Sequence, residues 1–172
     1  NIDKQNRPGS DRGRFTLAHE LGHYFIDNHR IGLKNGILEP HPSLTNQKQF
    51  LVIEREADYF ASCLLMPEPR FRNDIGNKKF SFDVIDSLRV QYGVSRTACA
   101  LRFADIGNCP IMVVYAENNI VKWVHSSEDF PFRWLINDNV VPLNTVMGEY
   151  FKNNHLADVF KTEQVWAIDC FK

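Results

Sequence analysis

The chain has 172 residues, of which 44% are hydrophobic and 12% aromatic, so it can bury a core of its own. Its 20 lysines and arginines nearly balance its 21 aspartates and glutamates, and a formal charge of -1 gives no sign of a protein that binds nucleic acid or an anionic membrane. No apolar run approaches the ~18 to 20 residues of a membrane-spanning helix, and the four cysteines form no CxxC pair, so we expect a cytoplasmic protein without membrane association.

The first predicted helix carries polar side chains among apolar ones. Residues 1–13 are polar and rich in turn formers, so regular structure is expected after them. In residues 15–25 the apolar side chains occupy most of the helix circumference, which predicts a central, buried helix. His19, Glu20 and His23 lie on it, and each polar group needs a compensating partner there.

A long connection and a second helix are expected next. Residues 27–48 contain two glycines and two prolines, which predict a long irregular loop. Between about Gln49 and Met66 apolar residues recur at spacings of three and four, which predicts an amphipathic helix. Pro67 ends this helix, because proline cannot donate to the helix ladder.

The rest of the chain predicts two short helices and a hairpin. Residues 81–106 favour a helix-turn-helix pattern in which Ser95 caps the second helix. After Pro110, the runs IMVVY and IVKWV flank the polar turn at residues 117–119, which predicts two antiparallel strands.

We therefore predict an α+β fold that is mainly helical. Three parts are expected: the core at residues 1–80, the helix-turn-helix-like segment at residues 81–107 and a small C-terminal α/β region at residues 108–172.

The sequence HELGH carries the strongest chemical signal. His19 and His23 are four residues apart and project from the same face of a helix, where both can hold one zinc ion. Glu20 can accept the proton of the attacking water and pass it to the leaving amine of a cut peptide. Three costly polar groups on an apolar helix argue against plain core histidines, so the pattern predicts a metallopeptidase.

A catalytic zinc site needs a third protein ligand, and the second helix offers two glutamates. Glu54 lies about 60° from the centre of the apolar face and Glu56 about 100° on the other side, so Glu54 is the expected ligand and Glu56 the alternative. The alternative role for Glu54 is an ion pair with a surface cation such as Arg55. Asp58, one turn after Glu54, is expected to orient a liganding histidine. These ligand types favour one Zn²⁺ and also admit another divalent ion.

The segments RFTLAHELGHYF and EREADYFASCLLMP resemble the ImmA/IrrE family of metallo-endopeptidases. The resemblance is close over residues 14–67, extends to the helix-turn-helix-like segment and is loose beyond it. It implies a gluzincin-like zinc fold with His19, His23 and Glu54 as metal ligands and Glu20 as the general base. It also implies a protein substrate, a helix-turn-helix transcriptional repressor of a mobile element or a stress response.

Two alternative functions stay open. A protein with this fold can act as a binding module that displaces a repressor without cutting it, although the intact Glu20 argues against this. A DNA-binding regulator would use residues 81–106, but three arginines balance three aspartates between Ser81 and Gly107, which makes a poor phosphate-binding surface. We therefore expect no nucleic-acid partner.

The group that stabilises the oxyanion in such a site is not fixed by the sequence. Five side chains are candidates: Tyr24, His29, His41, Tyr59 and Arg70.

Overall fold

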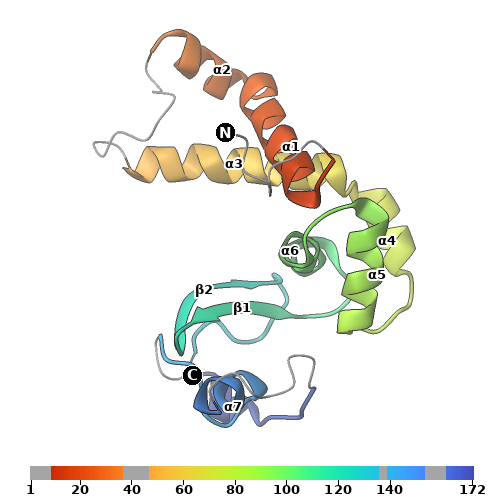
Figure 1. Cartoon of the computed structure of the whole chain (residues 1–172), viewed down its shortest axis with the longest axis vertical. Helices are drawn as coiled ribbons and strands as arrows, with labels where there is room; N and C mark the ends of the chain where they lie inside the picture. Colours follow the sequence, from red (N-terminus) through yellow and green to blue (C-terminus); the bar gives the residue numbers. More distant parts are fainter. Residues whose placement is uncertain (1–8, 37–46, 136–138, 154–161) are drawn as a thin grey trace. The chain divides into compact units, whose positions relative to one another are not determined.

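The computed structural model describes residues 9–36, 47–135, 139–153 and 162–172, and this part of the chain is mainly helical with one two-stranded sheet (Figure 1). The α+β fold class predicted from the sequence is confirmed. The chain divides into two compact units, Asn1–Lys78 with Asp83–Arg102, and Lys79–Phe82 with Phe103–Lys172. Among the described helices, none is long and apolar enough to cross a membrane.

Helix α1 (Asp11–Phe25) carries the HELGH sequence and is less buried than expected. Ser10 caps it, and its side-chain oxygen accepts a hydrogen bond from a backbone N–H of the first turn at 3.0 Å. Ala18 and Gly22 are its buried residues, whereas Phe25 is 61% exposed. The prediction of a helix buried on all sides is therefore wrong, because α1 packs one narrow face of small residues and leaves large apolar side chains at the surface.

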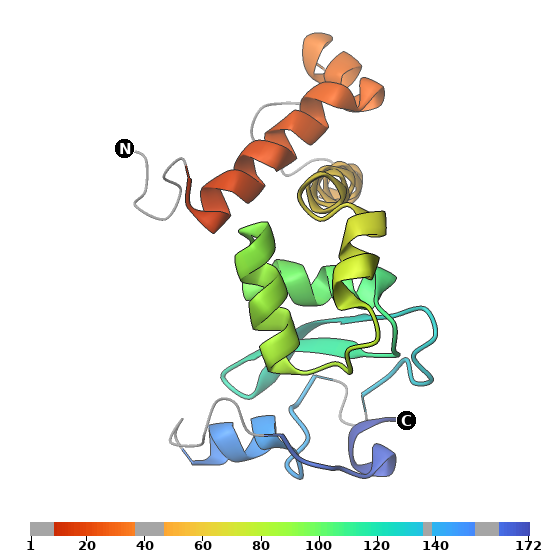
Figure 2. The ribbon, with the colours of Figure 1, turned by 90° about the vertical axis from the view of Figure 1, so that its right-hand side faces the viewer.

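Close packing joins α1 to α3 (Gln47–Leu65), which crosses it in Figure 1 and is seen nearly end-on beside it in Figure 2. A Cβ atom added at Gly22 would lie 3.1 Å from the Cα of Ala57 and 3.3 Å from the Cβ of Phe60. On α3, Ala57 and Ala61 are fully buried. Small residues on both helices let the two backbones approach, and this brings the polar groups of α1 within reach of those of α3.

Two further helices stand where the sequence indicated a loop and a helix end. Helix α2 (Asp27–Lys34) follows α1 after one extended residue, Ile26, and it buries His29. The prediction of an irregular loop is wrong for these residues, because a short buried helix leaves little periodicity in the sequence. Helix α4 (Glu68–Ile75) begins directly after Pro67 and holds a proline in its first turn, where no N–H donor is required.

Helices α5 (Phe82–Tyr92) and α6 (Arg96–Ile106) are the predicted helix pair. Ser95 caps α6, since its Oγ accepts a backbone N–H at 3.1 Å, and Gly93 in the turn has a φ of 60° that suits glycine. Arg14 of α1 donates from Nη1 to the carbonyl of the last residue of α5 at 3.0 Å. This hydrogen bond ties α5 to the start of the HELGH helix.

The predicted hairpin is also confirmed, in the second unit. Strands β1 (Met112–Glu117) and β2 (Ile120–Ser126) pair antiparallel. The turn between them consists of Asn118 and Asn119, both with positive φ, at 50° and 62°. Asparagine tolerates this left-handed backbone, and two such residues match the right-handed twist of paired strands.

The described residues that follow the hairpin contain two short helices and an aromatic cluster. The helices are α7 (Val146–Lys152) and α8 (Ala167–Cys170). Phe132 stacks on Phe171 with ring centroids 4.8 Å apart, and Phe130 meets Phe171 edge to face at 5.5 Å. Together these rings help to tie the C-terminal residues to the chain that follows the hairpin.

Candidate metal centre

Two helices bring three side chains to one point. His19 and His23 lie one turn apart on α1, and their Nε2 atoms are 3.0 Å apart. Glu54 on α3 places Oε2 3.2 Å from Nε2 of His19 and Oε1 3.4 Å from Nε2 of His23. Each residue offers one ligand atom, and within the described residues these atoms all lie within 4.8 Å of one another.

The spacing of these atoms fits a tetrahedral metal ion. Ligand atoms ~2.0 to 2.1 Å from zinc at tetrahedral angles are separated from one another by roughly 3.3 Å. In the structure the two Nε2 atoms are 3.0 Å apart, and each lies 3.2 or 3.4 Å from a different oxygen of Glu54, which is close to this value. Two imidazoles and one carboxylate also form a ligand set typical of catalytic zinc, which leaves a further position open.

The hydrogen bond behind His19 supports the same reading. Oδ1 of Asp58 lies 2.9 Å from Nδ1 of His19. A carboxylate only accepts hydrogen bonds, so Nδ1 of His19 carries the hydrogen and Nε2 of the neutral ring keeps its lone pair. This lone pair faces the carboxylate of Glu54, which is also a hydrogen-bond acceptor. Two acceptors repel each other at this distance, and a cation between them makes the arrangement favourable.

His23 is held through a second histidine. Its Nδ1 lies 3.2 Å from Nδ1 of His29 on α2, and Nε2 of His29 lies 2.7 Å from Oε2 of Glu56 on α3. The structure brings Glu54 to the two candidate ligand histidines, whereas Glu56, the alternative ligand, contacts His29. No periodicity marks His29 as part of the site, because its partners come from two other helices.

Burial and nearby charges act on His23 in opposite directions. The pKa of His23 lies below its ordinary value, mainly because of burial, although the negative charges of Glu54 and Glu20 raise it. A lowered pKa favours the neutral imidazole that a metal ion requires. Glu20 follows His19 on α1 and is exposed. Its carboxylate thus lies close enough to be felt at His23 and remains accessible to water and to a peptide.

The structure places four of the five candidate oxyanion groups. His29 is 1% exposed behind His23, and both of its ring nitrogens have partners, so it does not face a substrate. Tyr24 and Tyr59 are 60% and 61% exposed. Arg70 lies near Asp74, with Nε 3.8 Å from the carboxylate. His41 lies outside the described residues.

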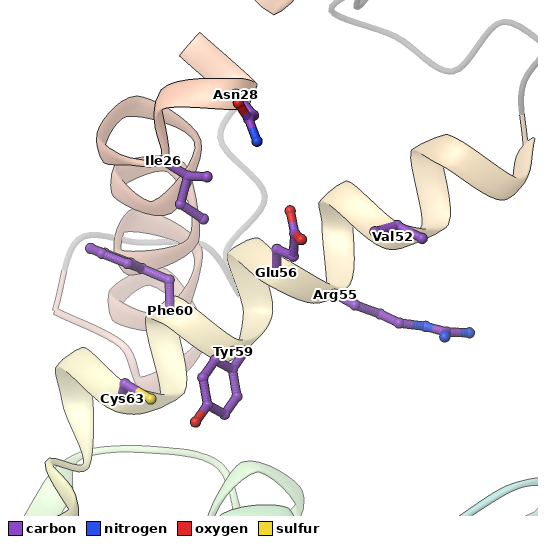
Figure 3. Close-up of a pocket in the computed structure, with 8 residues that line it drawn as sticks. All are labelled: Ile26, Asn28, Val52, Arg55, Glu56, Tyr59, Phe60 and Cys63. Atoms are coloured by element: carbon purple, nitrogen blue, oxygen red, sulfur yellow. The ribbon is translucent and has the colours of Figure 1, made fainter.

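A cleft of about 550 Å³ opens beside the site, between the turn from α1 to α2 and the exposed side of α3 (Figure 3). Its lining consists of Ile26, Asn28, Val52, Arg55, Glu56, Tyr59, Phe60 and Cys63. Figure 3 shows the carboxylate of Glu56 pointing from α3 towards the start of α2, which carries Asn28. The three candidate ligands do not line the cleft. The cleft is connected to the candidate metal site through Glu56, which lines it and contacts His29.

Comparison with known families agrees with this geometry. A peptidase family model described as the IrrE N-terminal-like domain matches residues 5–104, a segment that holds both helices of the site. Among curated proteins, no match to the chain is found.

Proposed function

Since the chain belongs to the ImmA/IrrE family of metallopeptidases, we propose that it is a zinc-dependent endopeptidase that cuts a helix-turn-helix transcriptional repressor. The observation that carries this proposal is the convergence of His19, His23 and Glu54 at separations suited to one zinc ion. An exposed carboxylate, Glu20, stands next to the first of them.

Different residues would bind the metal ion and transfer protons during peptide hydrolysis. Zinc, when bound, supplies Lewis-acid polarisation of the peptide carbonyl and lowers the pKa of the water that it holds. His19, His23 and Glu54 would hold the ion with two neutral ligands and one negative one, which would leave it a net positive charge for this chemistry. Glu20 accepts a proton from the attacking water and delivers it to the amine nitrogen as the peptide bond breaks.

The substrate and the compartment are the finer parts of the proposal. The resemblance of the HELGH and EREAD segments to those of repressor-cutting peptidases supports a repressor as the substrate. Such a protein meets its repressor in the cytoplasm. The alternative, a module that binds the repressor and leaves it intact, has no use for an exposed glutamate beside a metal ligand.

Cleavage of a helix-turn-helix repressor from the same genome, sought first among the neighbouring genes, tests the proposal. The zinc-loaded protein is incubated with the repressor, in parallel with the Glu20→Gln variant, which keeps the shape of the side chain and removes the base. We expect one cut by the unaltered protein, none after zinc is removed by a chelator, and none by the variant. A repressor left intact by the zinc-loaded protein, despite a measurable complex, would favour the binding module.

A further inference from the structure

His29 is the feature of this site that the peptidase chemistry does not yet use. It is 1% exposed, compared with 16% and 14% for the side chains of His19 and His23. Burying an imidazole is costly unless both ring nitrogens find partners. Both do so here, and one of the two partners is a candidate metal ligand.

The partners of His29 determine where each proton lies. Oε2 of Glu56 accepts, so Nε2 of His29 carries the hydrogen across the 2.7 Å contact. A neutral His29 then presents Nδ1 as an acceptor to Nδ1 of His23, 3.2 Å away. His23 must donate from Nδ1, and this leaves the lone pair on its Nε2, the atom that faces Glu54.

We propose that His29, oriented by Glu56, is a positioning residue that holds His23 in the tautomer and ring orientation needed for zinc to bind at Nε2. The inference rests on the proposed zinc site and adds to it a second layer contributed by α2. In this account a hydrogen-bond chain runs from Glu56 at the edge of the cleft through His29 to His23, which binds the metal.

The reverse tautomer shows why the order of partners matters. With a donor in place of Glu56, Nε2 of His29 would accept and its Nδ1 would carry the hydrogen. Nδ1 of His23 would then have to accept, and its Nε2 would carry a hydrogen where the metal ion belongs. A histidine buried only to fill the core has no such dependence on the acceptor at its far end.

Two variants of His29 with nearly equal shape separate positioning from packing. In His29→Leu, the acceptor for Nδ1 of His23 is lost, and we expect zinc affinity to fall by about 10- to 100-fold. In His29→Asn, an amide oxygen can accept in its place, and we expect most of that loss to be recovered. Zinc affinity is measured by competition with a chromophoric chelator, and Co²⁺ absorption reports the ligand geometry independently of activity.

A second pair of variants changes a side chain that tolerates substitution, because Glu56 is 53% exposed. Glu56→Gln and Glu56→Met remove the same charge and differ in whether they accept from His29. We expect Gln to keep zinc affinity within about threefold of the unaltered protein and Met to lower it by about tenfold. Glu68→Met is the matched control, since Glu68 is 50% exposed on α4 and pairs with Arg72, away from the candidate metal site.

The outcomes distinguish this inference from the proposed function. Equal zinc affinity in the two Glu56 variants, or an unchanged affinity and Co²⁺ spectrum in a folded His29→Leu variant, would overturn the positioning role and leave the zinc site intact. An unaltered protein that binds no zinc would instead overturn the proposed function. A graded loss, larger for Leu than for Asn and larger for Met than for Gln, supports the inference.

Discussion

His19 and His23 are supported in different ways, although both belong to one turn of α1. His19 meets the carboxylate of Asp58 directly at 2.9 Å, whereas His23 reaches the carboxylate of Glu56 only through His29. The side chain of Asp58 is 59% exposed and that of His29 is 1% exposed.

The difference in exposure predicts how much zinc affinity each histidine loses when its hydrogen-bond partner is removed. Water can accept a hydrogen bond from His19 when Asp58 is absent, because the contact lies at the surface. Behind His23, loss of the His29 acceptor would leave a buried donor without a partner, which costs more. The two candidate ligands therefore differ in how easily the group that holds each of them can be replaced.

The largest effect on zinc affinity is expected at Glu54, which contacts both His19 and His23. Its Oε2 faces His19 and its Oε1 faces His23, so Glu54→Gln removes the negative ligand from both. We expect zinc affinity to fall by more than about a hundredfold, beyond the loss from any supporting residue. Calorimetric titration with zinc measures this, and Glu68→Gln is the control. Unchanged affinity in the Glu54 variant would show that the ion lies elsewhere.

A methyl group at Gly22 is expected to separate α1 from α3 and so to disturb the contacts of both histidines with Glu54. Its Cβ would lie 3.1 Å from the Cα and 3.2 Å from the carbonyl oxygen of Ala57, and backbone atoms cannot give way cheaply. We expect Gly22→Ala to lower the free energy of unfolding by about 1 to 3 kcal/mol. This should hold although alanine favours helix by up to about 1 kcal/mol.

Urea unfolding tests this expectation, with Thr16→Ala on the exposed side of α1 as the control. A stabilised Gly22→Ala variant would mean that the two helices are not held together at this residue.

A smaller effect is expected at Asp58, and it tests the comparison directly. We expect Asp58→Ala to weaken zinc binding by about tenfold, near the lower end of the range for residues that orient ligands, because water replaces the exposed carboxylate. His29→Leu should cost more under the same conditions. If the Asp58 variant loses as much affinity as His29→Leu, burial does not set the importance of the two supports.

The smallest effect concerns a histidine–carboxylate contact in the other unit. Nε2 of His125 lies 2.7 Å from Oδ1 of Asp105, and this hydrogen bond raises the pKa of His125, whereas burial lowers that of His23. A pKa raised in the folded state gives stability that is present below the unfolded value of about 6.5 and is lost as the pH rises through the folded value. The effect is modest because the His125 side chain is 42% exposed.

Nuclear magnetic resonance of the His125 ring protons measures this shift. We expect the titration midpoint to fall in Asp105→Asn. Equal midpoints in the two proteins would show that the contact carries no charge-dependent stability.

Local periodicity explains what the sequence could predict. The spacing of four between His19 and His23 places both on one face of α1, and the periodicity of α3 favours Glu54 over Glu56 as the inward side chain. These inferences need only the geometry of single helices. The hairpin was equally accessible, because two asparagines between apolar runs specify a tight turn.

Features that depend on tertiary packing were not predicted. The partners of His29 follow from the extended backbone at Ile26, which starts α2 at an angle that no spacing in the sequence reveals. The exposure of Phe25 was missed for a related reason. An apolar residue on a helix indicates burial only when another element covers it, and in the described structure α1 packs through Ala18 and Gly22.

Diffraction from crystals of the zinc-loaded protein, measured on both sides of the zinc absorption edge, tests the central claim most directly. We expect one anomalous peak roughly 2.0 to 2.2 Å from Nε2 of His19, Nε2 of His23 and a carboxylate oxygen of Glu54. A peak coordinated through Glu56, through Nδ1 of either histidine, or away from α1 and α3 would contradict the metal site described above.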